Sequence, residues 1–386
     1  MRDRRYRLAV TAILCGLLFT ACKTLPPKPE VVTTLSGPER IDKYGGLHFD
    51  ITSGAFLTNG FSVSDTVVVA LAGNEVSMPV VVNYRHVAPG EFALVASPEP
   101  ARPLFTTIFY GDAATRLGIA HKLTTDGGGL QAWQPASDLV FPLPVTIRLE
   151  HKDEAAANVS ATEPTRTNAR GDYPNLTDAQ FANFRAVSAP YLATGVLYRS
   201  SSPIDPVLGR AVFADAAAKA AGIRTVVNMV NSGNEARALP GWKGSHVSGC
   251  ATLFRPMGVD VSAPDFAAGI ADSLRFIATN ATPCLLHCKE GKDRTGFACA
   301  VLELLFGATA DEAAADYLET FSNYYGQSPD SPEGAHTREL FFGILCRAFE
   351  LKSLKGVDLR AAARDYLLRA GLSPDDLSAL ESNLGN

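Results

Sequence analysis

The sequence has little of several features that define particular protein classes. Only 7 of its 386 residues are cysteine, too few for a chain held together by disulfide bonds. Charged residues make up 19% and hydrophobic residues 46%, an ordinary globular composition that excludes a disordered, collagen-like or coiled-coil protein. The formal net charge is −5, and because residues 1–21 contribute +3, the remainder carries −8. Such a balance argues against a general nucleic-acid binder.

Long apolar runs are missing after the N-terminus. A basic segment at residues 1–7 precedes an apolar stretch at residues 8–21, and no later segment approaches the length of a membrane-spanning helix. This short stretch predicts a signal peptide over residues 1–21. Residues 18–22 (LFTAC) resemble the bacterial lipoprotein signal, which implies lipid attachment at Cys22. The alternative is an ordinary signal peptide followed by a chance cysteine.

Residues 22–44 begin with closely spaced prolines and are expected to form an extended spacer behind the lipid. Signal, cysteine and spacer together predict an exported lipoprotein. We expect its N-terminal lipid to anchor it to the bacterial cell envelope, on the outer-membrane or periplasmic side or at the cell surface.

Residues 45–150 are expected to form a small β-rich domain. Short runs of β-branched and aromatic residues alternate there with turn residues. The runs at 67–71 and 76–82 flank residues 72–75, a plausible hairpin turn. We expect a sandwich or barrel with at most one helix, near residues 113–121. No catalytic set of residues is evident in this region, and the sequence does not indicate its role.

The polar residues 151–172 predict a linker. From residue 173 to residue 386 strands alternate with helices, which predicts an α/β domain with a central, mainly parallel sheet flanked by helices and a helical C-terminal part. Buried strands are expected at 223–229 and 283–287. Helices are expected at 212–221, 264–278, 295–306, 311–319, 333–350, 359–371 and 374–384.

The segment richest in chemistry lies between the second buried strand and a buried helix, at residues 287–296 (HCKEGKDRTG). Backbone N–H groups of a tight loop and a helix N-terminus can bind a phosphate together. Arg294, six positions after Cys288, can add a bidentate contact that a lysine could not reproduce. The same positive field favours the thiolate of Cys288, a nucleophile suited to in-line attack on phosphorus.

Other residues of this loop also fit phosphate chemistry. Gly291 permits backbone angles that a Cβ resists, and Thr295 could donate its hydroxyl to the departing sulfur. Two cations, Lys289 and Lys292, suit a substrate with several phosphates, unless one or both point to solvent. The mechanism needs no metal and no other cofactor. The residues expected to contact the substrate are His287, Lys289, Glu290, Gly291, Lys292 and Thr295.

This segment resembles the signature loop, His-Cys-x5-Arg-[Ser/Thr], of the cysteine-dependent protein tyrosine phosphatases. Its ending, Gly-Lys-Asp-Arg-Thr-Gly, is particularly similar to the secreted bacterial tyrosine phosphatases with protein and lipid activity. The resemblance covers residues 173–386 and leaves the β-rich region outside. Further similar segments are 183–185 (NFR), 195–200 (GVLYRS), 222–227 (GIRTVV), 315–318 (ADYL) and 365–368 (DYLL).

The resemblance implies a phosphocysteine intermediate on Cys288 and a general acid that protonates the leaving group and then activates water. The loop carboxylate, Asp293, is the candidate acid in this bacterial subfamily. The runner-up is Asp260 or Asp265 in the preceding loop, and for Asp265 a solvated surface carboxylate is the preferred interpretation.

The leading functional hypothesis is therefore a lipid-anchored phosphatase whose partners are phosphotyrosine proteins, phosphoinositides or both. A second enzymatic hypothesis is a phytase-like inositol-polyphosphate phosphatase. A third is a phosphate-binding pseudoenzyme or adhesin, which would have no need of the thiolate of Cys288. A rhodanese-type sulfurtransferase fits less well, because the spacing from Cys288 to Arg294 suits a phosphate cradle.

Overall fold

The computed structural model describes residues 31–124, 130–153 and 166–386. The predicted signal peptide, Cys22, and parts of the predicted spacer and linker lie outside these residues. Within the described ranges no helix has the length and apolar character needed to cross a bilayer. Val31–Asn386 form one compact unit, and we describe it as a β-rich region (residues 31–153) followed by an α/β region (residues 166–386).

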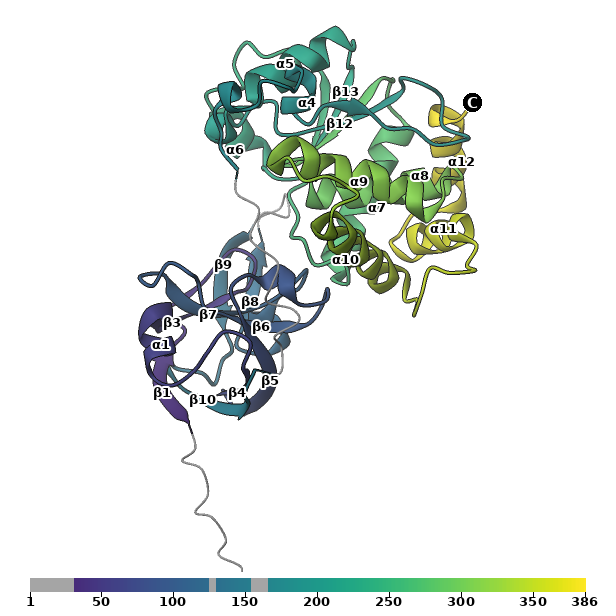
Figure 1. The fold of residues 1–386 in the computed structure, drawn as a ribbon. Helices are drawn as coiled ribbons and strands as arrows, with labels where there is room; N and C mark the ends of the chain where they lie inside the picture. The colour runs from purple at the N-terminus through teal and green to yellow at the C-terminus, as the bar shows by residue number, and fades with distance from the viewer. Residues whose placement is uncertain (1–30, 125–129, 154–165) are drawn as a thin grey trace, which may run out of the picture. The chain divides into compact units, whose positions relative to one another are not determined.

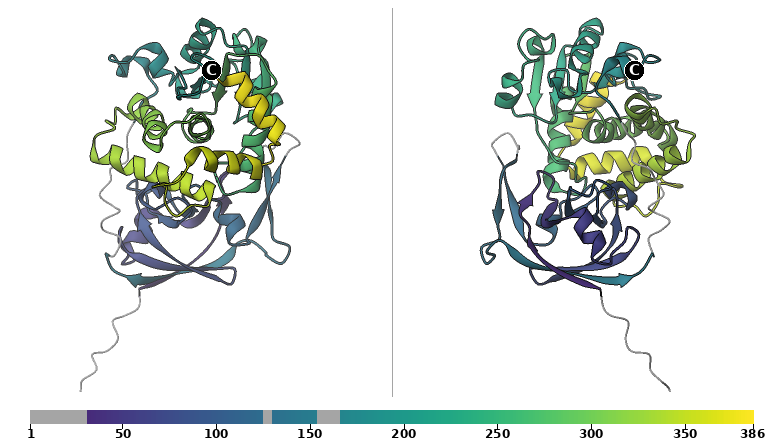
Figure 2. Two further views of the ribbon diagram at one scale, coloured as in Figure 1. Left: turned by 90° about the vertical axis from the view of Figure 1, so that its right-hand side faces the viewer. Right: turned by 60° about the vertical axis from the view of Figure 1, so that its left-hand side comes forward.

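The β-rich region is built on an eight-stranded sheet with strand order β1-β10-β4-β5-β6-β7-β3-β2. The sheet curves back on itself, because β1 also contacts β3 (Figure 2). Strands β8 and β9 form a separate antiparallel pair. The bounds are β1 Val32–Gly37, β2 Arg40–Ile41, β3 Leu47–Thr52, β4 Thr66–Leu71, β5 Asn74–Val81, β6 Phe92–Val95, β7 Pro103–Ile108, β8 Ala120–Thr124, β9 Leu130–Pro135 and β10 Leu143–His151.

Along the strands of this sheet, alternate side chains point to the same face. Val67, Val69 and Leu71 of β4 all enter one apolar core, as alternate residues on one face of a strand must. The predicted hairpin joins β4 to β5 through Ala72 and Gly73, both at positive φ (50° and 76°). Two consecutive residues at positive φ match the right-handed twist of the flanking strands.

Two expectations for this region are wrong. The sheet begins at β1 rather than at residue 45, so residues 32–37 and 40–41 belong to strands and not to a spacer. The region also has a helix besides α2 (Ala113–Arg116), namely α1 (Ser53–Thr58). Helix α1 has only six residues and depends on an N-cap, since the hydroxyl of Thr52 accepts from the N–H of Ala55 at 3.2 Å.

The α/β region contains a five-stranded sheet with strand order β11-β12-β15-β13-β14. Strand β11 is antiparallel to β12, and the other pairs are parallel. The central strand β15 is buried along its whole length, which is typical of a parallel sheet covered on both faces. The bounds are β11 Arg185–Ala186, β12 Leu197–Ser200, β13 Thr225–Asn228, β14 Ala251–Phe254 and β15 Cys284–His287.

Helices cover both faces of this sheet (Figure 1). Leu285 of β15 packs with α5 and α6, whereas Leu286 faces the larger core formed with α7 to α12. This mixed α/β architecture agrees with the predicted fold class. The bounds are α4 Asp178–Phe181, α5 Ala211–Ala220, α6 Gly233–Ala238, α7 Pro264–Ala278, α8 Asp293–Leu305, α9 Ala310–Tyr325, α10 Pro332–Phe349, α11 Leu359–Arg369 and α12 Pro374–Leu384.

The β-rich region packs against the α/β region. Val81, Val95 and Phe109 belong to the same apolar core as the helices of the α/β region. Polar contacts accompany this packing, since Arg85 Nη2 donates to Thr337 Oγ1 at 3.2 Å. The two regions therefore meet in one apolar core, while the β-rich region also has a core of its own.

Candidate active site

The loop singled out in the sequence follows the central strand and leads into a helix. Strand β15 ends at His287 and α8 begins at Asp293, so Cys288 lies at the carboxyl edge of the sheet and at the amino end of a 13-residue helix. Parallel sheets place their binding crevices at this edge. The helix adds positive potential there, which favours a bound anion.

Residues outside this loop donate hydrogen bonds to its backbone carbonyl oxygens. Arg199 Nη2 donates to the carbonyl of Gly291 at 2.6 Å, and Asn183 Nδ2 donates to that of Glu290 at 3.1 Å. The N–H of Ser202 donates to the carbonyl of Lys289 at 3.1 Å. Carbonyl groups turned outward leave the loop's N–H groups for the opposite side, which is the geometry of an anion nest.

A buried ion-pair network fixes the groups that hold the loop. Asp316 on α9 pairs with Arg185 at 2.6 Å and also with Arg199, which is fully buried. Burial alone would raise the pKa of Asp316, but the two guanidinium groups lower it below the usual range. The segments around residues 183–185 and 195–200, noted for their resemblance, thus supply the supports of the loop.

Gly291 is required by the loop's own geometry. Its φ is +69°, and a Cβ there would lie 2.3 Å from the carbonyl oxygen of Ser200. No residue with a side chain fits without moving the neighbouring strand end.

Arg294 and Cys288 are both buried in the loop. The side chain of Arg294 is only 6% exposed, and its Nη1 donates to the carbonyl oxygens of Met229 and Met257 at 3.3 and 3.2 Å. Burial would lower the pKa of Arg294, but its charge interactions with Cys288 and Tyr44 raise it. Among the described residues, neither Nε of Arg294 nor Oγ1 of the buried Thr295 has a hydrogen-bond partner. Unused buried donors of this kind suit a phosphate oxygen.

His287 is held neutral beside this pair. Its ring is buried, and Nδ1 lies 3.2 Å from the carbonyl oxygen of Cys288. Burial and the charge of Arg294 lower the pKa of His287 to about 4. The imidazole therefore orients the loop rather than adding charge to it.

Both regions of the chain line the cavity above Arg294. It has a volume of about 320 Å³. Lys289 and Arg294 line it from the α/β region, while Lys43, Tyr44 and Lys122 line it from the β-rich region. The described residues contain no group of three or more His, Cys, Asp or Glu that could hold a metal ion.

A model of the tyrosine phosphatase family matches residues 179–385, more than half of the chain. The chain belongs to this family. The family resemblance noted in the loop is confirmed at this level.

Other comparisons add little. No curated protein matches the chain. Among solved structures, an uncharacterised conserved protein from Thermotoga maritima is similar, with 19% identity and a TM-score of 0.23. That match covers 32% of this chain and only 40% of the other, so it supports no argument about the fold.

Two residues predicted to contact the substrate form ion pairs with other side chains. Glu290 pairs with Arg166 at 2.6 Å and with Lys292 at 3.0 Å. Burial works against the charge of Glu290, but these two cations lower its pKa to about 2. Burial likewise opposes the charge of Lys292, yet Asp293 and Glu290 raise its pKa well above the ordinary value. Neither Glu290 nor Lys292 lines the cavity above Arg294, whereas Lys289 does.

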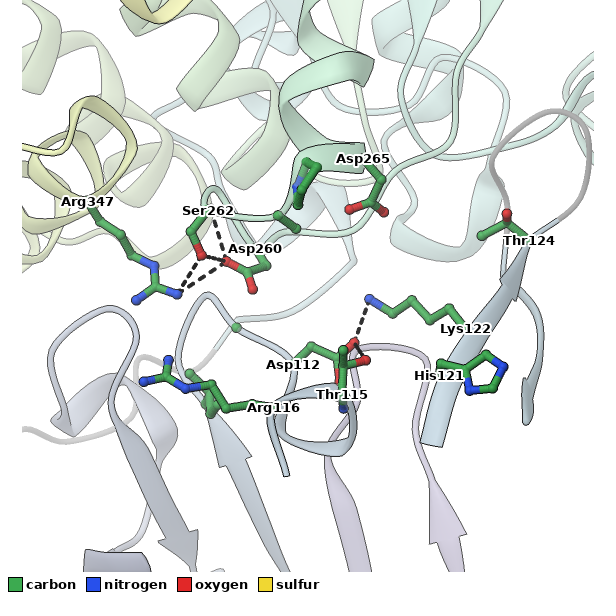
Figure 3. A pocket seen from close by; sticks show the side chains of 14 residues that line it. Asp112, Thr115, Arg116, His121, Lys122, Thr124, Asp260, Ser262, Asp265 and Arg347 are labelled. Atoms are coloured by element: carbon green, nitrogen blue, oxygen red, sulfur yellow. Dashed lines mark hydrogen bonds and ion pairs between the residues drawn. The ribbon is translucent and has the colours of Figure 1, made fainter. Parts of the chain in front are cut away.

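The three candidate general acids have different surroundings. Asp293 accepts a 2.6 Å hydrogen bond from the hydroxyl of Tyr110. Asp260 accepts from the hydroxyl of Ser262 at 2.7 Å and lies 3.5 Å from Arg347 (Figure 3).

Asp265 in the first turn of α7 is the one of the three that lines the cavity with Arg294. A neighbouring cavity of about 450 Å³ shares Lys122, Thr124 and Asp265 with it, and Figure 3 shows the carboxylate of Asp265 turned toward Lys122. Asp265 is exposed, as the sequence led us to expect, and it also borders this cavity.

Sequence reasoning missed the lysines and the tyrosine that the β-rich region brings to the phosphatase cavity. Lys43 and Tyr44 follow β2, and Lys122 lies on β8, more than 160 residues before Cys288. No spacing rule links such distant positions. The only local signal is the Lys-Tyr pair placed directly before two glycines, Gly45 and Gly46, in a turn.

Proposed function

We propose that this phosphatase hydrolyses phosphate monoesters through a covalent phosphocysteine intermediate on Cys288, and that it acts on phosphotyrosine proteins, phosphoinositides or both. The proposal is carried by one loop that places the buried Cys288 directly after β15 and the buried Arg294, which lines the cavity, in the first turn of α8. This arrangement holds a nucleophile and an anion-binding group at one point, as displacement at phosphorus requires.

In the first step, the Cys288 thiolate attacks phosphorus while the bond from phosphorus to the ester oxygen breaks. Arg294 and the loop N–H groups bind the non-bridging oxygens as their charge redistributes. A carboxylic acid gives its proton to the leaving oxygen; we assign this role to Asp293, which precedes Arg294 in the loop, with Asp265, which lines the cavity, as the alternative.

In the second step, water attacks the phosphorus and the bond from phosphorus to sulfur breaks. The carboxylate of Asp293 takes the proton of the water, and orthophosphate leaves. Thr295, whose hydroxyl has no partner among the described residues, stabilises the departing thiolate.

Phosphate release tests this proposal. Wild type and Cys288→Ser are assayed on a phosphotyrosine peptide, on phosphoinositides and on inositol hexakisphosphate, under reducing conditions and without metal. We expect release by the wild type only. A folded wild-type protein that releases no phosphate from any of the three would favour a phosphate-binding module instead.

Inositol-polyphosphate hydrolysis is the second candidate, and the cations around the cavity favour it. Lys43, Lys122, Lys289 and Arg294 all line this space. Release from inositol hexakisphosphate but not from the peptide or the lipids would select this candidate.

We also propose that the enzyme is exported and anchored to the cell envelope through a lipid on Cys22. The support is the N-terminal sequence, which lies outside the described residues. Membrane fractionation of the wild type and of Cys22→Ala tests it, since only the wild type should remain with the membrane.

A further inference from the structure

The β-rich region forms one wall of the phosphatase cavity. Lys43 and Tyr44 lie in the turn between β2 and β3, and Lys122 lies on β8. Lys43 and Tyr44 are exposed, with Tyr44 at 37%. Lys122 reaches toward the α/β region, because its Nζ lies 3.9 Å from the position a Cβ would take at Gly258. The β-rich region that carries this wall packs against the α/β region through Val81, Val95 and Phe109.

Cations dominate the groups that this cavity offers to a ligand. Two of its carboxylates are already used as helix caps, since Asp205 accepts from the N–H of Val207 at 3.0 Å and Glu235 accepts from that of Ser232 at 2.7 Å. Lys122 pairs with Asp112 at 2.9 Å, and its Nζ also lies over the ring of Trp133, 5.5 Å from its centre. The Nζ of Lys43 lies over the ring of Tyr44, 4.8 Å from its centre, and leaves its three donors accessible.

The cavity also exceeds what one phosphate needs. A volume of about 320 Å³ lies at the lower end of the range that holds a whole small molecule. Arg294 and the catalytic loop bind the phosphate that is cleaved. The lysines on the opposite wall are then left to face another part of the same substrate.

We infer that Lys43 and Lys122, with Tyr44 beside them, bind a second phosphate group of the substrate while the loop holds the first. The preferred substrate is therefore a small ring that carries several phosphates, either free or as a lipid headgroup. The β-rich region determines specificity by supplying these contacts. This inference rests on the proposed phosphatase function.

The role of Lys292 supports the same assignment. The sequence suggested that Lys289 and Lys292 would together receive a multiply phosphorylated substrate, but Lys292 is committed to Glu290 and Asp293. Lys292 does not line the cavity, whereas Lys43 and Lys122 do, so these two lysines provide the positive charge that faces a substrate there.

Steady-state kinetics of the full chain test the inference. The variants are Lys43→Gln, Lys122→Gln, their combination and Lys43→Arg, with Lys219→Gln as control because Lys219 is an exposed lysine on α5. The substrates are p-nitrophenyl phosphate, a phosphotyrosine peptide, inositol hexakisphosphate and a short-chain phosphatidylinositol bisphosphate. The measured quantities are kcat and KM for each variant on each substrate.

We expect each Lys→Gln change to lower kcat/KM about tenfold on at least one multiply phosphorylated substrate, mainly through KM, because a charge-assisted contact is lost. On p-nitrophenyl phosphate the loss should stay below about threefold, since only long-range charge is removed. Lys43→Arg should keep most of the preference, and Lys219→Gln all of it. The preferred substrate, free or lipid, identifies the source of the phosphates.

Equal losses on p-nitrophenyl phosphate and on the multiply phosphorylated substrates would overturn the inference, as would a loss confined to the phosphotyrosine peptide. Lys122→Gln leaves Asp112 without its cation, so thermal unfolding is measured as well; Lys43→Gln carries no such risk because Lys43 is exposed. A wild type inactive even on p-nitrophenyl phosphate would instead contradict the proposed function.

Discussion

The hydroxyl of Tyr110 donates a 2.6 Å hydrogen bond to Oδ1 of Asp293, and so ties the β-rich region to the first residue of α8. Tyr110 follows β7 and is buried, and its hydroxyl also lies 3.1 Å from that of Tyr317. Burial and the nearby carboxylate raise the pKa of Tyr110 well above the ordinary value, so its proton stays in place. The residue proposed as general acid is thereby oriented by a distant part of the chain.

Replacing Tyr110 with phenylalanine should free the carboxylate of Asp293. We expect kcat to fall about tenfold on an alkyl phosphate, whose leaving oxygen needs a proton, and clearly less on p-nitrophenyl phosphate. Tyr317→Phe is the matched control, because it removes the neighbouring hydroxyl without touching Asp293 directly. Losses of the same size on both substrates would show that Tyr110 acts only through stability.

Gly291→Ala should disable the loop. The added Cβ would meet the carbonyl of Ser200 at 2.3 Å, and φ is +69° there. Displacing the loop by even 1 Å predicts a loss of about a hundredfold in kcat/KM. Gly356→Ala is the control, since φ is +74° with no atom within 4 Å of its Cβ position among the described residues. Full activity of Gly291→Ala would refute the proposed geometry.

Arg199→Lys keeps the charge of Arg199 but cannot reach Asp316 and the carbonyl of Gly291 together. We expect about 3 kcal/mol of lost stability, measured by urea unfolding, because a buried network loses a partner. We also expect a fall of about tenfold in kcat/KM as the loop loosens. Arg360→Lys, in an exposed pair with Glu381, should change the free energy of unfolding by less than about 1 kcal/mol. Equal losses of stability in Arg199→Lys and Arg360→Lys would contradict the role of Arg199 in holding the loop.

The lowered pKa of His287 predicts how the free energy of unfolding depends on pH. Its pKa is lowered from 6.5 to about 4 in the folded protein, so the unfolded chain binds a proton more readily between these values. The contribution of the neutral His287 to the free energy of unfolding is therefore fully present above pH 6.5. It falls by about 3 kcal/mol as the pH drops toward 4.

His287→Asn removes this titration while keeping a donor near Nδ1. The free energy of unfolding of the wild type and of His287→Asn is measured with urea from pH 7 to pH 4. The difference between the two free energies should shrink as the pH falls. A constant difference over that range would mean that His287 does not titrate as described.

The sequence predicts the catalytic loop well because its chemistry is local. Cys288, Gly291 and Arg294 lie in one contiguous segment, and a strand and a helix on either side fix its place at the sheet edge. The predicted helix at 264–278 coincides with α7, since a proline at its start and an amphipathic pattern mark its ends.

The parts that the sequence could not supply depend on tertiary contacts. Lys292 and Lys289 look equivalent in the sequence, but ion pairs within the fold turn only Lys292 away from the cavity. Lys43 and Lys122 reach the site through packing between regions far apart in the chain. Helix α1 is too short for a periodic pattern and depends on its cap.

The most direct test of the central claim is to trap the covalent intermediate. Wild type and Cys288→Ser are mixed with an aryl phosphate, quenched rapidly, digested and examined by mass spectrometry. We predict a phosphate adduct on the peptide that contains Cys288, in the wild type alone and only while substrate is being turned over. Turnover without any adduct on Cys288, or an unchanged rate in Cys288→Ser, would contradict the account.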